Sequence, residues 1–412
     1  MQRAGGDTST DTDGGGYTIA VAASIGAFSR DEWSRLPGTS KSSSTRPYNP
    51  FVSYDFLSSI EDSGCAVPRT GWQGHHLRLE TREGAFAGAV PCYAKSHSQG
   101  EYVFDHGWAD AFERAGGRYY PKLQAAVPFT PVTGPRLLVT EDRPEDARSA
   151  LASGLKMVTD RLGVSSAHVT FAEDTDVEAL TAAGFLERTD QQFHFINRSY
   201  AGYDDFLATL ASRKRKALKK ERREALSSGI SIDWLTGRDI TERAWDDFFA
   251  FYMDTGGRKW GKPYLNRTFF SLIGERMAED ILLVMARRGG RYIAGAINFI
   301  GSDALYGRNW GCVEDHPFLH FEVCYHQAID FAIARGLRVV EAGAQGEHKL
   351  ARGYMPVTMR SAHYLAHPGL RNAVADYLRR ERREVAAMGE YLVDHGPFRK
   401  DLSAKGSDGR EG

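Results

Sequence analysis

Apolar and polar positions along the first half of the chain follow two kinds of pattern. YTIAVAASI (17–25) and SAHVTFA (166–172) have the composition of strands. Between them, RSALASGLKMVTDRLG (148–163) has the residue pattern of a helix. After them, GFLERTDQQFHFIN (184–197) predicts another strand. Because strands and helices are interleaved, the pattern predicts a mixed fold of the α/β or α+β class.

The second half repeats this order of elements. Residues 203–229 are expected to form one helix, since four apolar residues recur at the spacing of a single stripe. These residues are Leu210, Ala217, Leu218 and Ala225. Residues 280–311 predict three strands in a meander with GG and GSD as turns. A helix over 320–336, stopped by Gly336, and a strand over 337–342 complete the half.

EAGAQGEHKLARGY (341–354) follows directly on that last strand. It combines three glycines, two carboxylates, a histidine, a lysine and an arginine. Open α/β sheets place their sites at such strand ends, which favours a catalytic loop. The alternative is a turn in which Glu347, Lys349 and Arg352 form surface ion pairs.

The length of the chain indicates the number of domains. A chain of 412 residues is longer than one core usually grows, so two domains are expected. We predict a disordered leader (1–16), two domains (17–190 and 191–370), and a charged helix with a tail (371–412). The net charge of −1 neither favours nor excludes a charged partner, so any anion-binding surface must come from local clustering.

The cysteines and the apolar runs bear on location. The four cysteines form no CxxC pair, so neither a zinc site nor a disulfide framework is indicated. The amino terminus lacks the apolar core of a signal peptide. The longest aliphatic run, 281–286, is far shorter than the ~20 residues that span a bilayer. A cytoplasmic protein without a membrane span is expected.

Several long motifs carry a resemblance to a known family. They are NPFVSYDFL, TGWQGHHL, YAKSHSQGEYVFDHGWADAF, YYPKLQAAVPFTPVTGPRLL, LASRKRKALKKERR, YGRNWGCVEDHPFLHFEVCYHQAIDFAI and AGAQGEHKLARGYMPVT. Over roughly residues 46 to 370 the chain resembles bacterial predicted N-acyltransferases related to the Fem peptidyltransferases (FemAB-like). The resemblance implies two tandem GNAT-like domains, with mixed sheets flanked by helices, and transfer of an acyl or aminoacyl group to an amine acceptor.

A further likeness concerns the donor. Fem enzymes use aminoacyl-tRNA, and their second lobe has a basic helix, a tryptophan and a lysine that resemble residues 212–230, Trp310 and Lys349 here. This chain has RGY where those enzymes favour Phe-Gly. It also lacks the Gln/Arg-x-x-Gly-x-Gly/Ala turn with which GNAT enzymes hold coenzyme A. Aminoacyl-tRNA is therefore the leading donor, a coenzyme A or carrier-protein thioester the runner-up, and a non-catalytic peptidoglycan- or nucleic-acid-recognition protein the alternative outside enzymes.

Acyl transfer to an amine needs a base, an oxyanion donor and a charge that stabilises the leaving group. Lys349 can supply the charge, Glu347 or His348 the base, and the N–H groups around Gly343 and Gly346 an anion nest. Neither a metal nor a redox cofactor is expected.

Four further residues of the second half are candidates. Glu322 lies four residues before His326 on one helix, as base and orienter or as a buried carboxylate bonded to its neighbours. Arg308, at a strand end, could hold a carboxylate or phosphate, or pair with Glu314 or Asp315. Trp310 and Arg352 are expected to contact substrate.

Polar and aromatic residues alternate at residues 93–110 in the first half. We expect four side chains to shape a pocket for a small polar substrate, against the alternative of a solvated loop. They are His97, Glu101, Asp105 and Lys122.

The run SRKRKALKKERR carries eight Lys or Arg in twelve residues. Phosphate or RNA binding is expected from Arg213, Lys214, Lys216 and Lys220. The alternative is a solvated helix whose charge is partly offset by Glu221 and Glu224.

Overall fold

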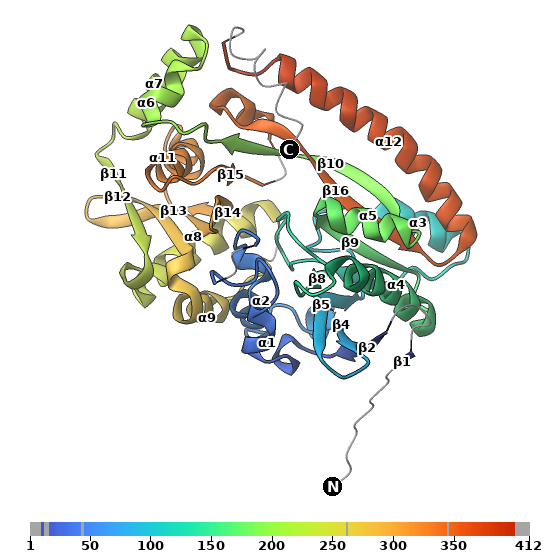
Figure 1. Ribbon diagram of the computed structural model, residues 1–412. Coiled ribbons are helices and arrows are strands. Elements are labelled where there is room, and N and C mark those ends of the chain that lie inside the picture. The colour runs from blue at the N-terminus through green and yellow to red at the C-terminus, as the bar shows by residue number, and fades with distance from the viewer. Residues whose placement is uncertain (1–9, 12–15, 43–44, 261–262, 344–345, 400–412) are drawn as a thin grey trace. The chain divides into compact units, whose positions relative to one another are not determined.

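The computed structural model describes residues 10–11, 16–42, 45–260, 263–343 and 346–399. The chain forms two compact units, each described by itself below. The first contains residues 1–190 and 359–385, and the second contains residues 191–358 and 386–412. Figure 1 shows both units with their elements labelled. Of the predicted leader, residues 1–9 and 12–15 lie outside the described part.

The first unit contains two sets of strands. Its elements are β1 (Thr10–Asp11), β2 (Tyr17–Ala22), α1 (Arg30–Ser34), α2 (Tyr54–Asp62), β3 (Trp72–Gly74), β4 (His76–Thr81), β5 (Phe86–Val90), β6 (Cys92–Lys95), α3 (His106–Arg114), β7 (Lys122–Ala125), β8 (Leu138–Val139), α4 (Pro144–Leu162), β9 (Ser166–Ala172) and α5 (Asp174–Ala182). An antiparallel sheet has the order β1-β2-β4-β5-β8. The other set has the order β16-β9-β7-β6-β3, in which only the pair β7 and β9 is parallel. β16 is Met355–Leu365.

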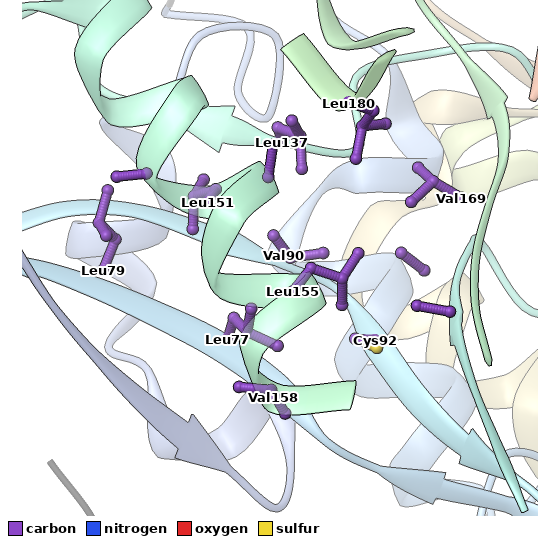
Figure 2. Packing of buried hydrophobic residues seen from close by; sticks show 14 of the residues in the cluster. Leu77, Leu79, Val90, Cys92, Leu137, Leu151, Leu155, Val158, Val169 and Leu180 are labelled. Carbon is purple, nitrogen blue, oxygen red and sulfur yellow. The ribbon is translucent and has the colours of Figure 1, made fainter. Parts of the chain in front are cut away.

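Helix α4 forms the core of this unit together with the strands (Figure 1). Leu77 and Leu79 alternate with the more exposed residues of β4, as a strand with one buried face requires. Leu151 and Leu155, four residues apart on one face of α4, pack in the same cluster. Figure 2 shows Leu151 and Leu155 of α4 close to Leu77 and Leu79, with Val169 of β9 farther along the same cluster, near Leu180.

The second unit is built on a meander followed by a crossover helix. Its elements are β10 (Leu186–Ile196), α6 (Tyr203–Ala208), α7 (Ser212–Ala225), β11 (Ile230–Thr236), α8 (Glu242–Trp260), α9 (Arg267–Met277), β12 (Ile281–Arg288), β13 (Arg291–Ile300), β14 (Ala304–Cys312), α10 (Leu319–Phe321), α11 (Gln327–Ala334) and β15 (Val339–Glu341). The order is β11-β12-β13-β14-β15-β10, and only β14 and β15 run parallel. The predicted meander over 280–311 is confirmed. Helix α12 (Pro368–Asp394) begins in the first unit and ends in the second.

Helix α8 lies on β13 and β14 and approaches β14 closely at Gly311. A Cβ atom at Gly311 would lie only 2.0 Å from the carbonyl oxygen of Phe251. Glycine is therefore required for this approach of helix to strand.

Two predicted helices of this unit differ from those observed. Residues 203–229 contain α6 and α7 instead of one helix, and at the break the Ala211 N–H donates to the carbonyl of Pro397 (3.0 Å), outside both helices. Leu218 and Ala225 are buried as predicted, but Ala217 is exposed. The helix over 320–336 contains a π-helical turn, η6 (Glu322–His326), between α10 and α11. Such turns occur frequently at functional sites.

None of the helices in the described part of the chain is long and apolar enough to cross a membrane. In the same residues, no group of three or more His, Cys, Asp or Glu side chains could hold a metal ion.

Candidate functional site

Three neighbouring strands of the second unit, β10, β14 and β15, lie beside the glycine-rich segment. β14 and β15 pair only through 304–306 and 339–341; β15 ends there, whereas β14 continues to Cys312 beside β13. His194 of β10 pairs with Glu341 at the end of β15. The predicted strand-end position of Arg308 is wrong, because Arg308 lies within β14, just beyond its pairing with β15. The chain leaves this strand end into the short helix η7 (Glu347–Arg352). The predicted strand-end position of the segment is therefore confirmed.

Lys349 lies in η7 and is buried, with 3% of its surface exposed. Its Nζ atom donates to the carbonyl of Gly343 at 2.9 Å. Burial, together with the nearby Arg308 guanidinium, lowers the pKa of Lys349 to about 8, against a weaker opposing effect of Cys324. Lys349 is thus a largely protonated cation near neutral pH that needs little further desolvation on contact with a ligand.

Arg308 and His194 lie close to Lys349. The guanidinium of Arg308 donates to the carbonyl of Gly307 (2.8 Å) and lies 3.4 Å from Glu341 Oε2. Burial lowers the pKa of His194 to about 3, with Arg308 and Lys349 contributing, so this imidazole is neutral. Glu341 is the carboxylate beside Arg308.

Glu314 was one of the two carboxylates suggested as alternatives for Arg308. It lies instead against Arg288, at 3.3 Å, and against Arg291. The prediction missed Glu341 because its position follows from the pairing of β14 with β15.

Arg352 is also buried, so the interpretation of Lys349 and Arg352 as surface ion pairs is wrong. Its guanidinium donates to both carboxylate oxygens of Glu221, at 2.9 and 2.6 Å, and to the carbonyl of His348 at 2.6 Å. It also lies over the Phe321 ring, 3.4 Å from the centroid. A cation held by a bidentate carboxylate and an aromatic face has a fixed orientation.

Glu322 lies fully buried in η6, and both its oxygens are bonded. Arg222 of α7 donates to them at 3.0 and 2.8 Å, and Gln327 donates to Oε1 at 2.7 Å. Glu322 is thus a buried carboxylate bonded to its neighbours, which was one of the two predicted alternatives. Its partners come from α7 and α11 and not from neighbouring strands. His326, its predicted companion, turns to other partners, Tyr203 (2.5 Å) and Glu221 (2.7 Å).

The remaining candidates of this unit lie around the same segment. His348 is exposed, and its Nε2 lies 3.0 Å from the Tyr325 hydroxyl. The Trp310 ring is 5.2 Å from the ring of His320. The side chain of Glu347, and part of the predicted anion nest at 344–345, lie outside the described residues.

The four predicted phosphate-binding residues, Arg213, Lys214, Lys216 and Lys220, are all exposed on α7. Arg222, which belongs to the same basic run, instead points inward to Glu322. The helix therefore has an exposed cationic face and an inner face whose charges are paired within the protein.

The candidates of the first unit form a buried ion cluster. Lys122 Nζ lies 2.7 Å from Glu101 Oε2 and 2.5 Å from Asp105 Oδ2, and all three side chains are at most 3% exposed. Burial opposes the charge of Lys122, yet the two carboxylates outweigh it and raise the pKa. His97 lies at the edge of the cluster, with Nε2 3.0 Å from the carbonyl of Thr70. The alternative of a solvated loop is wrong for the three buried residues, which bind one another.

A separate cavity of about 330 Å³ in the first unit contains none of the predicted residues. Its lining includes Arg46, Leu138, Val139, Thr140 and Arg148. The two arginines pair with carboxylates, Arg46 with Glu173 and Arg148 with Asp176.

Sequence reasoning missed the partners of the glycine-rich segment. Glu221 was interpreted only as a charge that offsets the basic run, and Arg222 as part of that run. One signal could have found them, because residues 221 and 222 lie three and four positions after the buried Leu218 and so share its face.

Comparison with solved structures finds the same fold. The crystal structure of FemX aligns with a TM-score of 0.52 and 11% identity, covering 84% of this chain and 98% of that one. L-PGS from Bacillus licheniformis aligns with a TM-score of 0.47 and 9% identity, covering 78% of this chain and 95% of that one. A tandem GNAT protein from the clavulanic acid biosynthesis pathway aligns with a TM-score of 0.46 and 12% identity, covering 85% of this chain and 99% of that one. The mixed α/β, tandem GNAT-like fold class predicted from the sequence is confirmed.

A search of curated protein sequences finds no match. Residues 24–400, nearly the whole chain, match the FemAB-like family, described as acting in peptidoglycan biosynthesis and recognition. The match includes both units and the complete strand-end site around Lys349. The chain therefore belongs to the FemAB-like family.

Proposed function

We propose that this protein is an N-acyltransferase that moves an acyl or aminoacyl group onto an amine acceptor, with Lys349 as the essential charge. The observation that carries the proposal is the buried Lys349 beside Arg308, next to the end of β15. A cation already removed from water stabilises developing negative charge without reorganisation. Membership of a family associated with peptidoglycan biosynthesis supports this reaction class.

The reaction follows from the groups present. The acceptor amine loses a proton to a base and attacks the carbonyl carbon of the donor, so that a C–N bond forms. The bond from that carbon to the donor's oxygen or sulfur then breaks, and the leaving group takes up a proton. Lys349, protonated, stabilises the oxyanion or the leaving group, and Arg308 holds an anionic group of a substrate. Trp310 and Arg352 are proposed to contact the substrate from the same region.

Three residues remain candidates for the base. Glu322 has both oxygens bonded to Arg222 and Gln327, so its geometry suits a positioning role. His348 is exposed beside Lys349, and Glu347 precedes it in the chain. The variants Glu347→Gln and Glu322→Gln distinguish the two carboxylates. Only the variant that lacks the true base should lose transfer activity that partly returns at higher pH.

Aminoacyl-tRNA is the proposed donor. The exposed cations of α7 support it, because a row of lysine and arginine side chains suits a phosphate backbone. A thioester of coenzyme A or of a carrier protein is the competing donor. Peptidoglycan recognition without chemistry would leave the cations around Lys349 unused.

The test offers purified protein two series of labelled donors, aminoacyl-tRNAs and acyl thioesters, with lysine-containing peptidoglycan peptides as acceptors. Lys349→Ala is expected to lower the transfer rate at least ~100-fold with an unchanged circular dichroism spectrum. Lys41→Ala, at an exposed position of the first unit, controls for loss of a lysine. Near-normal turnover by Lys349→Ala would contradict the role of Lys349, and peptide binding without transfer from any donor would favour recognition.

A further inference from the structure

Two consecutive residues of α7 turn away from its basic face and into the protein. Glu221 accepts hydrogen bonds from Nε and Nη2 of Arg352, and its Oε1 lies 2.7 Å from Nε2 of His326. Burial opposes the charge of Glu221, but His326 and Arg352 outweigh it and lower the pKa. Arg222 binds Glu322 and also Asp330, at 2.7 Å. The basic helix is thus attached to η6 and η7 by charged hydrogen bonds.

The attachment leads directly to Lys349. Arg352, at the end of η7, donates to the carbonyl of His348, the residue before Lys349 in the chain. The Arg352 guanidinium cannot turn freely, because Glu221 binds one side and the Phe321 ring covers its face. Through this one guanidinium, the carboxylate of Glu221 on α7, 131 residues away in the chain from Arg352, is connected to the backbone next to Lys349.

The same helix exposes the cations that are proposed to meet the donor. Lys220 is the neighbour of Glu221, and Lys216 lies one turn before it on the exposed face. Phosphates bound there would restrain the helix that Glu221 ties to η7. Binding of the donor to α7 would then change the mobility of η7, which carries Lys349.

We propose that Glu221 is a positioning residue that couples occupation of the basic face of α7 to the placement of Lys349. This deepens the proposed function and rests on it, because it takes Lys349 as the catalytic charge. Glu221 acts only through Arg352 and His348 and touches no substrate. A purely structural Glu221 would stabilise the fold without making η7 respond to a ligand on α7.

Hydrogen exchange tests the coupling without requiring turnover. Peptides covering residues 346–354 are followed by mass spectrometry with and without purified uncharged tRNA as the probe. In the parent protein, tRNA is expected to slow exchange of this segment several-fold. In Glu221→Gln the segment is expected to exchange ~10-fold faster than in the parent, because Arg352 loses its charged partner. Bound tRNA should no longer slow it, although tRNA affinity is unchanged.

Glu224→Gln is the matched control, since Glu224 lies on the same helix and is exposed. Exchange of 346–354 in Glu221→Gln that equals exchange in Glu224→Gln would overturn the proposal. So would a parent protein in which tRNA leaves the segment unaffected. If Glu221→Gln does not unfold cooperatively, Arg352→Lys, which keeps the charge but loses the bidentate geometry, takes its place with the same outcomes.

Transfer kinetics on the same variants separate this inference from the proposed function. Glu221→Gln is expected to lower kcat ~10-fold or more with little change in KM for the acceptor. Should the parent transfer no group from any donor, the proposed function fails, and the exchange data still decide whether Glu221 positions the segment.

Discussion

Lys349→Met is expected to stabilise the protein at neutral pH while removing its activity. Burial is the main reason why the pKa of Lys349 falls from 10.5 to about 8, which corresponds to about 3 kcal/mol against the charged form in the folded state. Methionine has a similar shape without the charge. Loss of the hydrogen bond to the Gly343 carbonyl cancels about 1 kcal/mol of the stabilisation gained by removing the charge. The net gain in unfolding free energy at pH 7 is therefore about 2 kcal/mol.

The pH dependence gives this prediction its sign. Between pH 8 and 10.5 the unfolded parent keeps the proton on Lys349 and the folded parent has lost it, so the parent gains stability as the pH rises. Lys349→Met cannot titrate there. The difference in unfolding free energy between Lys349→Met and the parent should thus be largest below pH 8 and should decrease toward pH 10.5.

Urea denaturation of both proteins at pH 7 and pH 9.5 measures the effect. Lys214→Met, at an exposed position of α7, is the control and should change stability by less than ~0.5 kcal/mol at either pH. A Lys349→Met protein that is less stable than the parent at pH 7, or whose difference from it is independent of pH, would refute the reasoning.

Two further predictions concern the two clusters of charge. Replacing Arg213, Lys216 and Lys220 by Ala should weaken tRNA binding, and each lost phosphate contact should reduce the slope of log affinity against log salt by nearly one; unchanged slopes in filter binding would favour a thioester donor. Lys122→Met should lower the unfolding free energy by ~3–5 kcal/mol in urea, because Glu101 and Asp105 lose their buried cation, and a change below ~1 kcal/mol would contradict the charge pairing.

Local patterns in the sequence predicted several elements of both units and the position of the glycine-rich segment after a strand. The meander over 280–311 and the helix stop at Gly336 follow from turn residues and from a backbone φ of +65° that glycine tolerates. The glycine-rich segment after β15 was predicted from its own composition and from the strand before it. Such features depend on neighbours in the chain, so one sequence suffices to find them.

Burial and choice of partner were decided by the tertiary structure alone. The basic run indicated a charged helix but not that Arg222 would bind Glu322, 100 residues away, or that α6 and α7 would be separate helices. The same holds for Glu221 and Arg352. Periodicity tells which residues share a face, whereas the pairing of β14 with β15 and the packing of α7 on η6 decide what that face meets. The lowered pKa of Lys349 arises in the same way, because desolvation exists only after the chain has closed around the side chain.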